Sequence, residues 1–156
     1  KASGPAGMVS GQSLDLSELA NPTISDAQLR EIHQLKTGKL ISACINMVLT
    51  AGSPMPIAAT ALQQFANHLG LVFQMQDDYL DKYASSELLG KGRSSDTANE
   101  KTTFATLYNQ HELSQLIAQH FQKAQEALTP VIKHADDLRD FIEYLHQRIE
   151  AASPCE

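Results

Sequence analysis

The sequence has little positive charge and few of the residues that build covalent or aromatic frameworks. Its 156 residues hold 12 lysines and arginines against 18 acidic residues, for a formal net charge of −6, with no tryptophan and only two cysteines. Nucleic acid and anionic membrane surfaces bind to basic faces, so the composition excludes them as general partners. Two cysteines, Cys44 and Cys155, are too few for a disulfide framework, which indicates a reduced, cytoplasmic compartment.

The sequence also has no uninterrupted apolar run of about 18 residues, the length that a membrane-spanning helix needs. We therefore predict no membrane span. Hydrophobic residues make up 42% of the chain and charged residues 19%, a balance that allows one globular domain with a buried core. The chain opens on Lys1, and residues 2–7 (ASGPAG) are typical of the interior of a protein. We expect residues 1–156 to be part of a larger domain.

The first half of the sequence predicts a helix that is interrupted at a glycine. Ser25 followed by Gln28 has the form of a capping box, which predicts a helix from there toward Lys36. Apolar residues continue the helical spacing beyond Lys36, but Gly38 interrupts it. A glycine costs a helix about 1 kcal/mol relative to alanine, so it often marks a kink or a close approach. A kink here turns the side chains of Lys36 and Thr37 inward, where an ammonium and a hydroxyl can bind phosphate.

Residues 57–83 predict the central helix of the chain. They follow a clear break at residues 52–56 (GSPMP), and at 1.5 Å per residue they span about 40 Å. The middle of this stretch is almost entirely apolar, so we expect it to be buried. Residues 102–156 predict two or three amphipathic helices, with a separation between Thr129 and Ala135. Together these patterns predict an all-α fold, a helical bundle.

The end of the central helix carries an acidic ladder. Gln74, Asp77, Asp78 and Asp81 fall at i, i+3, i+4 and i+7, so they share one helix face. Like charges one turn apart repel each other, and the helix dipole disfavours anions near a C-terminus. A bound cation removes both penalties, and carboxylate oxygens suit Mg²⁺, which often shares its shell with a substrate phosphate. The alternative is a solvated acidic helix end.

The acidic ladder also belongs to a longer pattern. Phe73-Gln74 followed by Asp77-Asp78 and Asp81 resembles FQxxDDxxD, the second aspartate-rich motif of the trans-polyprenyl diphosphate synthases, the bacterial farnesyl diphosphate synthases in particular. Further segments resemble other motifs of that family, in the same order: residues 7–15 (GMVSGQSLD), 33–38 (HQLKTG), 89–96 (LGKGRSSD) and 101–103 (KTT). The resemblance covers nearly the whole chain but only the C-terminal half of such an enzyme.

The resemblance implies a function and a set of site residues. Enzymes of this family are all-α homodimers that ionise an allylic diphosphate and let isopentenyl diphosphate attack the carbocation. Residues 85–100 are polar and interrupted by glycine, which is typical of a lid, and we expect them to be mobile; a plain solvated loop is the alternative. The implied assignments are Lys36, Thr37 and Gln74 to catalysis and substrate binding, Lys91 and Lys101 to the diphosphate, and Asp77, Asp78 and Asp81 to Mg²⁺.

The family carries two aspartate-rich motifs, and the sequence offers a second DDxxD at Asp136, Asp137 and Asp140. We interpret this copy as the start of a helix, where acidic residues are favourable and where no arginine-rich tail follows. The true first motif is then absent. The chain supplies half of the metal clamp, so we predict that it is inactive alone, with Leu69 and Val72 exposed unless another chain covers them.

Two other functions stay open from the sequence. The chain could be a non-catalytic subunit of a heteromeric prenyl synthase, or a helical interaction domain whose acidic face is solvated. A titration with Mg²⁺ and pyrophosphate distinguishes the interaction domain, because a solvated acidic face binds neither.

Overall fold

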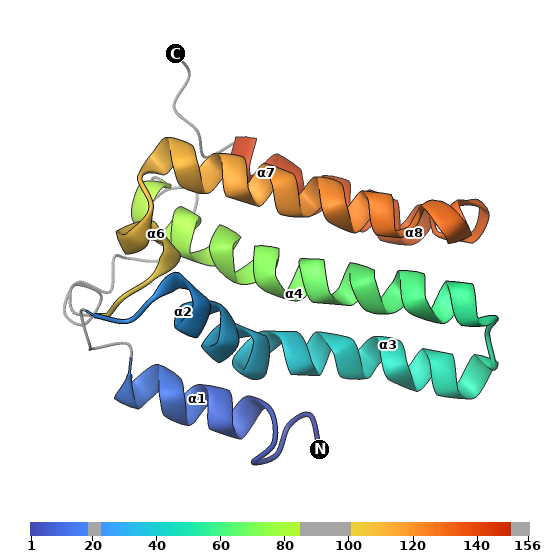
Figure 1. Ribbon diagram of the computed structural model, residues 1–156. Coiled ribbons are helices and arrows are strands. Elements are labelled where there is room, and N and C mark those ends of the chain that lie inside the picture. Colours follow the sequence, from blue (N-terminus) through green and yellow to red (C-terminus); the bar gives the residue numbers. More distant parts are fainter. Residues whose placement is uncertain (19–22, 85–100, 151–156) are drawn as a thin grey trace.

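A computed structural model describes residues 1–18, 23–84 and 101–150, and all regular structure in these ranges is helical (Figure 1). This confirms the predicted all-α fold. In chain order the elements are α1 (Met8–Ser17), α2 (Asp26–His33), the π-helical turn η1 (Gln34–Gly38), α3 (Lys39–Gly52), α4 (Pro56–Tyr83), α6 (Phe104–Leu107), α7 (Gln110–Ala127), the 3-10 turn η2 (Thr129–His134) and α8 (Asp136–Glu150).

Helix α4 is the centre of the bundle. It lies between α3 on one side and α7 on the other, and α8 lies alongside α7 (Figure 1). It begins with Pro56 in its first turn, one residue before the predicted start, and ends at Tyr83 as predicted. Proline is well tolerated there because the first amides of a helix have no intrahelical partner. The largest buried side chains of α4 include Phe65, Met75 and Tyr79, which confirms that the helix is central.

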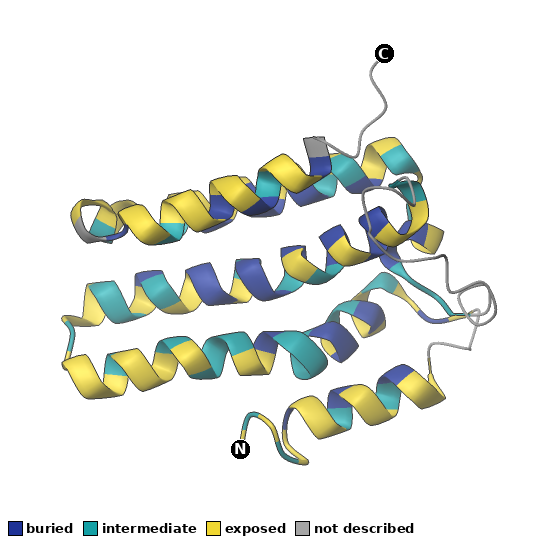
Figure 2. Cartoon of the chain, turned by 180° about the vertical axis from the view of Figure 1, so that it is seen from behind, coloured by how far each residue is buried: buried dark blue, intermediate teal, exposed yellow. Residues whose placement is uncertain are grey.

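The prediction that Leu69 and Val72 are exposed is wrong. They are 6% and 0% exposed, because both belong to the apolar core that α4 forms with its neighbours. Helices α3 and α8, in contrast, do expose apolar side chains. Helix α3 has no buried residue (Figure 2), and its main packing partners in the described part of the chain are α4 and η1. The large exposed apolar side chains of α3 and α8 are Leu40, Met47, Val48, Phe141 and Tyr144.

Helix α2 runs through η1 into α3. The predicted capping box is present: the Gln28 amide donates to Ser25 Oγ at 3.3 Å, and the Ser25 amide donates to Gln28 Oε1 at 3.0 Å. At the predicted interruption the chain forms the π-helical turn η1. The predicted close approach is present there, since a Cβ atom on Gly70 of α4 would lie 2.8 Å from the Gly38 Cα atom.

The second DDxxD sequence lies at a helix start, as predicted. Helix α8 begins at Asp136, with Asp137 also in its first turn, and Arg139 Nη1 lies 3.7 Å from Asp136 Oδ1. Asp136, Asp137 and Asp140 are all exposed. Within the described ranges, no helix is both long and apolar enough to cross a membrane.

Candidate functional site

The acidic ladder at the end of α4 divides into two parts. Asp77 and Asp81 are exposed, whereas Asp78 is 9% exposed and faces the interior. Asp78 Oδ1 accepts a hydrogen bond from Gln74 Nε2 at 3.0 Å, and its Oδ2 accepts one from the Phe104 backbone amide at 2.9 Å. Asp78 therefore joins the end of α4 to the start of α6.

Burial raises the pKa of Asp78 to about 6. The hydrogen bonds from Phe104 and Gln74 lower it, while the charges of Asp77 and Asp81 raise it further. A carboxyl group in this position is expensive to ionise, and the two donors compensate part of that cost. Asp78 is thus a buried acid of the ladder with two hydrogen-bond donors beside it.

The carboxylates of the ladder are the candidate ligands for Mg²⁺. Among the described residues no three histidine, cysteine or acidic side chains gather closely enough to hold a metal ion. Asp77 and Asp81 nevertheless offer hard oxygen ligands one turn apart on the exposed side of α4. This donor set fits Mg²⁺, which keeps several waters and takes one or two protein carboxylates together with phosphate oxygens. The metal assignment stays a prediction.

Two predicted site lysines meet at one oxygen atom. Lys36 Nζ lies 3.0 Å and Lys101 Nζ 3.3 Å from Asp15 Oδ2. Lys36 belongs to η1, Lys101 to the segment before α6, and Asp15 to α1. Asp15 is 4% exposed. Burial alone would raise the pKa of Asp15, but the hydrogen bonds and charges of the two lysines outweigh it and hold this pKa below its ordinary value. Asp15 is therefore ionised at neutral pH, with two cations beside it.

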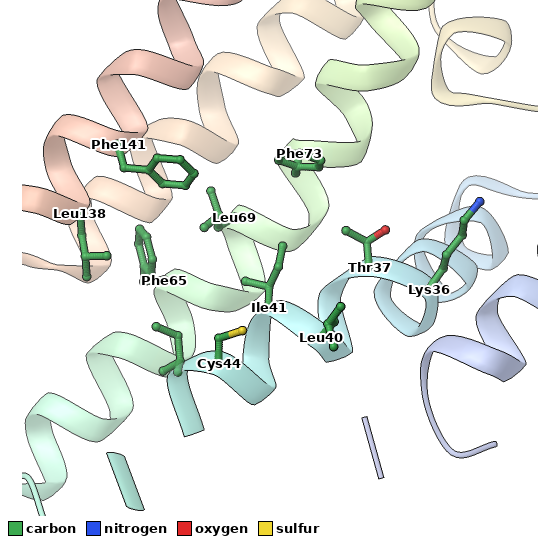
Figure 3. A pocket seen from close by; sticks show the side chains of 11 residues that line it. Lys36, Thr37, Leu40, Ile41, Cys44, Phe65, Leu69, Phe73, Leu138 and Phe141 are labelled. Carbon is green, nitrogen blue, oxygen red and sulfur yellow. The ribbon is translucent and has the colours of Figure 1, made fainter. Parts of the chain in front are cut away.

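An apolar cavity of about 480 Å³ has Lys36 among its lining residues (Figure 3). Lys36 and Thr37 lie at its edge, and the Lys36 nitrogen points away from the apolar side chains. The rest of the lining comes from α3, α4 and α8 and includes Leu40, Ile41, Cys44, Phe65, Leu69, Phe73, Leu138 and Phe141. A cavity with this division suits a molecule that has an apolar body and an anionic end.

Sequence reasoning missed the part played by Asp15. Asp15 lies in the segment GMVSGQSLD, but its neighbours in the sequence do not predict a contact with Lys36 or Lys101. His33 was likewise noted only as part of a motif. It is 3% exposed, its ring lies 5.4 Å from that of Phe104, and burial lowers its pKa to about 4. Lys91 and the predicted lid, residues 85–100, lie outside the described residues.

Comparison with known proteins identifies similar chains of greater length. A sequence model described as polyprenyl synthetase matches residues 5–147. The farnesyl diphosphate synthase of Geobacillus stearothermophilus is 37% identical over 128 residues, which are 82% of this chain and 43% of that protein. The farnesyl diphosphate synthase of Escherichia coli is 34% identical over 94% of this chain and 50% of its own length.

Solved structures agree with the sequence matches. A geranyltransferase from Legionella pneumophila superposes with a TM-score of 0.83 at 46% identity, over 97% of this chain and 48% of that one. A geranyltransferase from Helicobacter pylori, described as complexed with magnesium and isoprenyl diphosphate, superposes with a TM-score of 0.71 at 28% identity and the same two coverages. The chain thus spans about half the length of the relatives that it matches.

Proposed function

The chain belongs to the polyprenyl synthetase family, and we propose that it supplies one magnesium-diphosphate site of a prenyltransferase. The proposed reaction condenses isopentenyl diphosphate with an allylic diphosphate, as in geranyl or farnesyl diphosphate synthesis. The observation that carries the proposal is that Lys36 and Thr37 line the apolar cavity, while the Lys36 ammonium shares an Asp15 oxygen with a second lysine, Lys101. An allylic diphosphate has the matching division into an apolar body and an anionic end.

Each side chain then has a role that its chemistry allows. The ammonium groups of Lys36 and Lys101 bind diphosphate oxygens as point charges, and the Thr37 hydroxyl adds a donor. The side-chain amide of Gln74 donates a hydrogen bond to Asp78, so Gln74 orients one carboxylate of the ladder. In the intact enzyme, the apolar lining would keep water away from a carbocation once the exposed side of the cavity is covered. Lys91 is assigned to the same diphosphate by the family motif alone.

The acidic ladder is assigned to Mg²⁺. Asp77 and Asp81 would hold the ion, and Asp78 would reach it by exchanging one of its present hydrogen bonds. When bound, Mg²⁺ stabilises the negative charge that develops on the leaving diphosphate. The proposal is supported by the donor set and by the similar geranyltransferase of Helicobacter pylori described as complexed with magnesium.

We also propose how the chain fits into an intact enzyme. The relatives are about twice as long. The motifs favour residues 1–156 as the C-terminal part of one all-α domain, whose other half would supply the first aspartate-rich motif. The intact enzyme is a cytoplasmic homodimer. A non-catalytic subunit of a heteromeric synthase has the same fold, and a separately encoded partner half would identify it.

A calorimetric titration of the 156-residue chain with inorganic pyrophosphate, with and without Mg²⁺, tests the proposed function. We expect saturable binding that needs the metal and weakens in Asp77→Ala. The exposed apolar side chains of α3 favour a second candidate, a helical interaction domain. That candidate predicts no heat of binding under either condition, and such a result would overturn the diphosphate site.

A further inference from the structure

Asp15 is the point at which α1 meets both lysines of the site. Lys36 and Lys101 are far apart in the sequence, and each places its Nζ atom on the same carboxylate oxygen. We propose that Asp15 is a positioning residue, whose buried carboxylate holds the two ammonium groups together so that they bind one diphosphate. This inference rests on the proposed function, and it assigns α1 a role in the site.

Helix α1 holds Lys36 by its backbone as well as by its side chain. Gly11 and Asp15 are one turn apart, so they share a face of α1. The backbone of Gly11 lies directly against that of Lys36, since a Cβ atom on Gly11 would lie 2.2 Å from the backbone nitrogen of Lys36. The same face of α1 therefore fixes the Lys36 backbone at Gly11 and the Lys36 ammonium at Asp15.

The other sides of both lysines are fixed as well. Helix α4 closes on η1 at Gly70, which touches Gly38 two residues after Lys36. Lys101 lies three residues before Phe104, whose amide is bonded to Asp78 on α4. Each lysine thus has a backbone held near α4 and a side chain held by α1, and Asp15 is the group that the two share.

A shared carboxylate leaves the lysines able to bind an anion. A lysine ammonium has three donor hydrogens, and Asp15 occupies one direction on each. The Lys36 and Lys101 side chains are 29% and 41% exposed, whereas that of Asp15 is 6% exposed. The anchor is therefore buried while the ammonium groups face solvent. Without the carboxylate, two like charges repel and two long side chains regain their rotamer freedom.

Positioning and simple charge balance predict opposite results for Asp15→Asn. This substitution keeps the size of the side chain but raises the net charge beside the lysines by one. If Asp15 only neutralises charge, its removal strengthens the binding of an anion. If Asp15 positions the lysines, its removal weakens that binding, because the ammonium groups separate before the anion arrives. The direction of the change therefore distinguishes the two roles.

The test is a calorimetric titration of the 156-residue chain with Mg²⁺ and inorganic pyrophosphate. We expect Asp15→Asn to bind about tenfold more weakly than the unaltered chain. Asp15→Glu keeps the charge but moves it by one methylene, so its affinity for pyrophosphate should lie between those of Asp15→Asn and the unaltered chain. Glu18→Gln is the matched control, because it removes one negative charge from an exposed position at the end of the same helix and should leave binding unchanged.

A second measurement follows the lysines without any ligand. Acylation of amines, read by mass spectrometry, should modify Lys36 and Lys101 faster in Asp15→Asn than in the unaltered chain. The exposed Lys39 and Lys133 serve as internal references and should not change. Equal rates at Lys36 and Lys101 in the two proteins would overturn the inference, whatever the pyrophosphate titration shows.

The outcomes separate this inference from the proposed function. If the unaltered chain does not bind pyrophosphate, the proposed function is overturned and the role of Asp15 in it falls too. If the unaltered chain binds and Asp15→Asn binds as tightly or more tightly, the site stands and positioning by Asp15 is overturned. If Asp15→Asn loses its helical circular dichroism, the variant has not folded and Asp15→Glu takes its place in the test. A pyrophosphate affinity of Asp15→Glu equal to that of the unaltered chain would then overturn the inference.

Discussion

Asp78 Oδ2 accepts a hydrogen bond from the Phe104 backbone amide at 2.9 Å, which links the end of α4 to the start of α6. Asp78→Ala removes this acceptor and leaves a buried amide without its partner, a loss of about 1–3 kcal/mol in the free energy of unfolding. Urea denaturation of the 156-residue chain measures it. Asp77→Ala is the control, since Asp77 is exposed, and we expect a change within about 0.5 kcal/mol. Equal losses in the two variants would contradict the structural role of Asp78.

Catalysis in the intact enzyme should depend on Asp77 far more than on Asp140. In the intact enzyme, Asp77→Ala should lower kcat more than it raises KM, because a metal ligand matters most as charge develops on the leaving diphosphate. Asp140→Ala, at an exposed position of α8, should leave turnover intact. Steady-state kinetics of both variants check this. A collapse of turnover at Asp140 would mean that the second DDxxD sequence is the metal site.

The stability of the chain should fall as the solution is acidified from pH 6.5 to pH 4. Burial lowers the pKa of His33 and of His120 to about 4, whereas the pKa of each is 6.5 in the unfolded chain. Between these two values the unfolded chain binds the protons more readily, so the folded state loses stability as the pH falls from 6.5 toward 4. Asp78 acts in the opposite sense, because its pKa is about 6 when folded and 3.8 when unfolded. Two histidines outweigh one carboxyl, and we expect a net loss of about 1–3 kcal/mol.

Urea titrations at pH 7 and pH 4.5 measure this loss, and His33→Leu provides the comparison. Replacing His33 removes one of the two groups that must stay neutral in the fold, so the variant should lose less stability over the same interval. An identical pH dependence in the variant would show that His33 does not carry the effect.

The contact between Gly38 and Gly70 should tolerate no side chain. In Gly70→Ala the new Cβ atom meets backbone at 2.8 Å, which neither helix can relieve without shifting, and overpacking of this kind costs about 1–3 kcal/mol. Gly52→Ala is the matched control, because nothing lies within 4 Å of a Cβ atom there. Thermal unfolding of both variants measures the difference. Equal midpoints would show that α4 and η1 are not tightly packed.

The sequence predicted those features that depend on local chemistry. The capping box at Ser25, the end of α4 at Tyr83 and the start of α8 at Asp136 all follow from neighbouring residues. Features that join distant segments could not be read in this way. The burial of Asp15 depends on Lys36 and Lys101, whose approach is a property of the fold.

The acidic ladder shows the same limit. Helical spacing predicts that its members share one side of α4, and it treats them as equivalent. Their separation arises because Asp78 meets the Phe104 amide, which the chain brings back from a distant position. The error over Leu69 and Val72 has the same origin, since other helices of this chain already cover them.

The last prediction is that the 156-residue chain alone has no prenyltransferase activity. Two exposed carboxylates on one helix can hold part of a magnesium shell, which leaves the charge of a departing diphosphate partly uncompensated. The cavity also needs a further wall, because Leu40, Phe73 and Phe141 line it and are exposed. Water can then reach a carbocation. The exposed apolar side chains should in addition cause the purified chain to self-associate.

The assay combines radiolabelled isopentenyl diphosphate, an allylic diphosphate and Mg²⁺ with the purified chain, and repeats the measurement after the N-terminal half is added. We expect product only in the second mixture. With Asp77→Ala in place of the unaltered chain, the second mixture should also yield little product, which ties the recovery to the ladder. Product from the chain alone would show that residues 1–156 already stabilise the leaving diphosphate, and the half-site proposal would then be wrong.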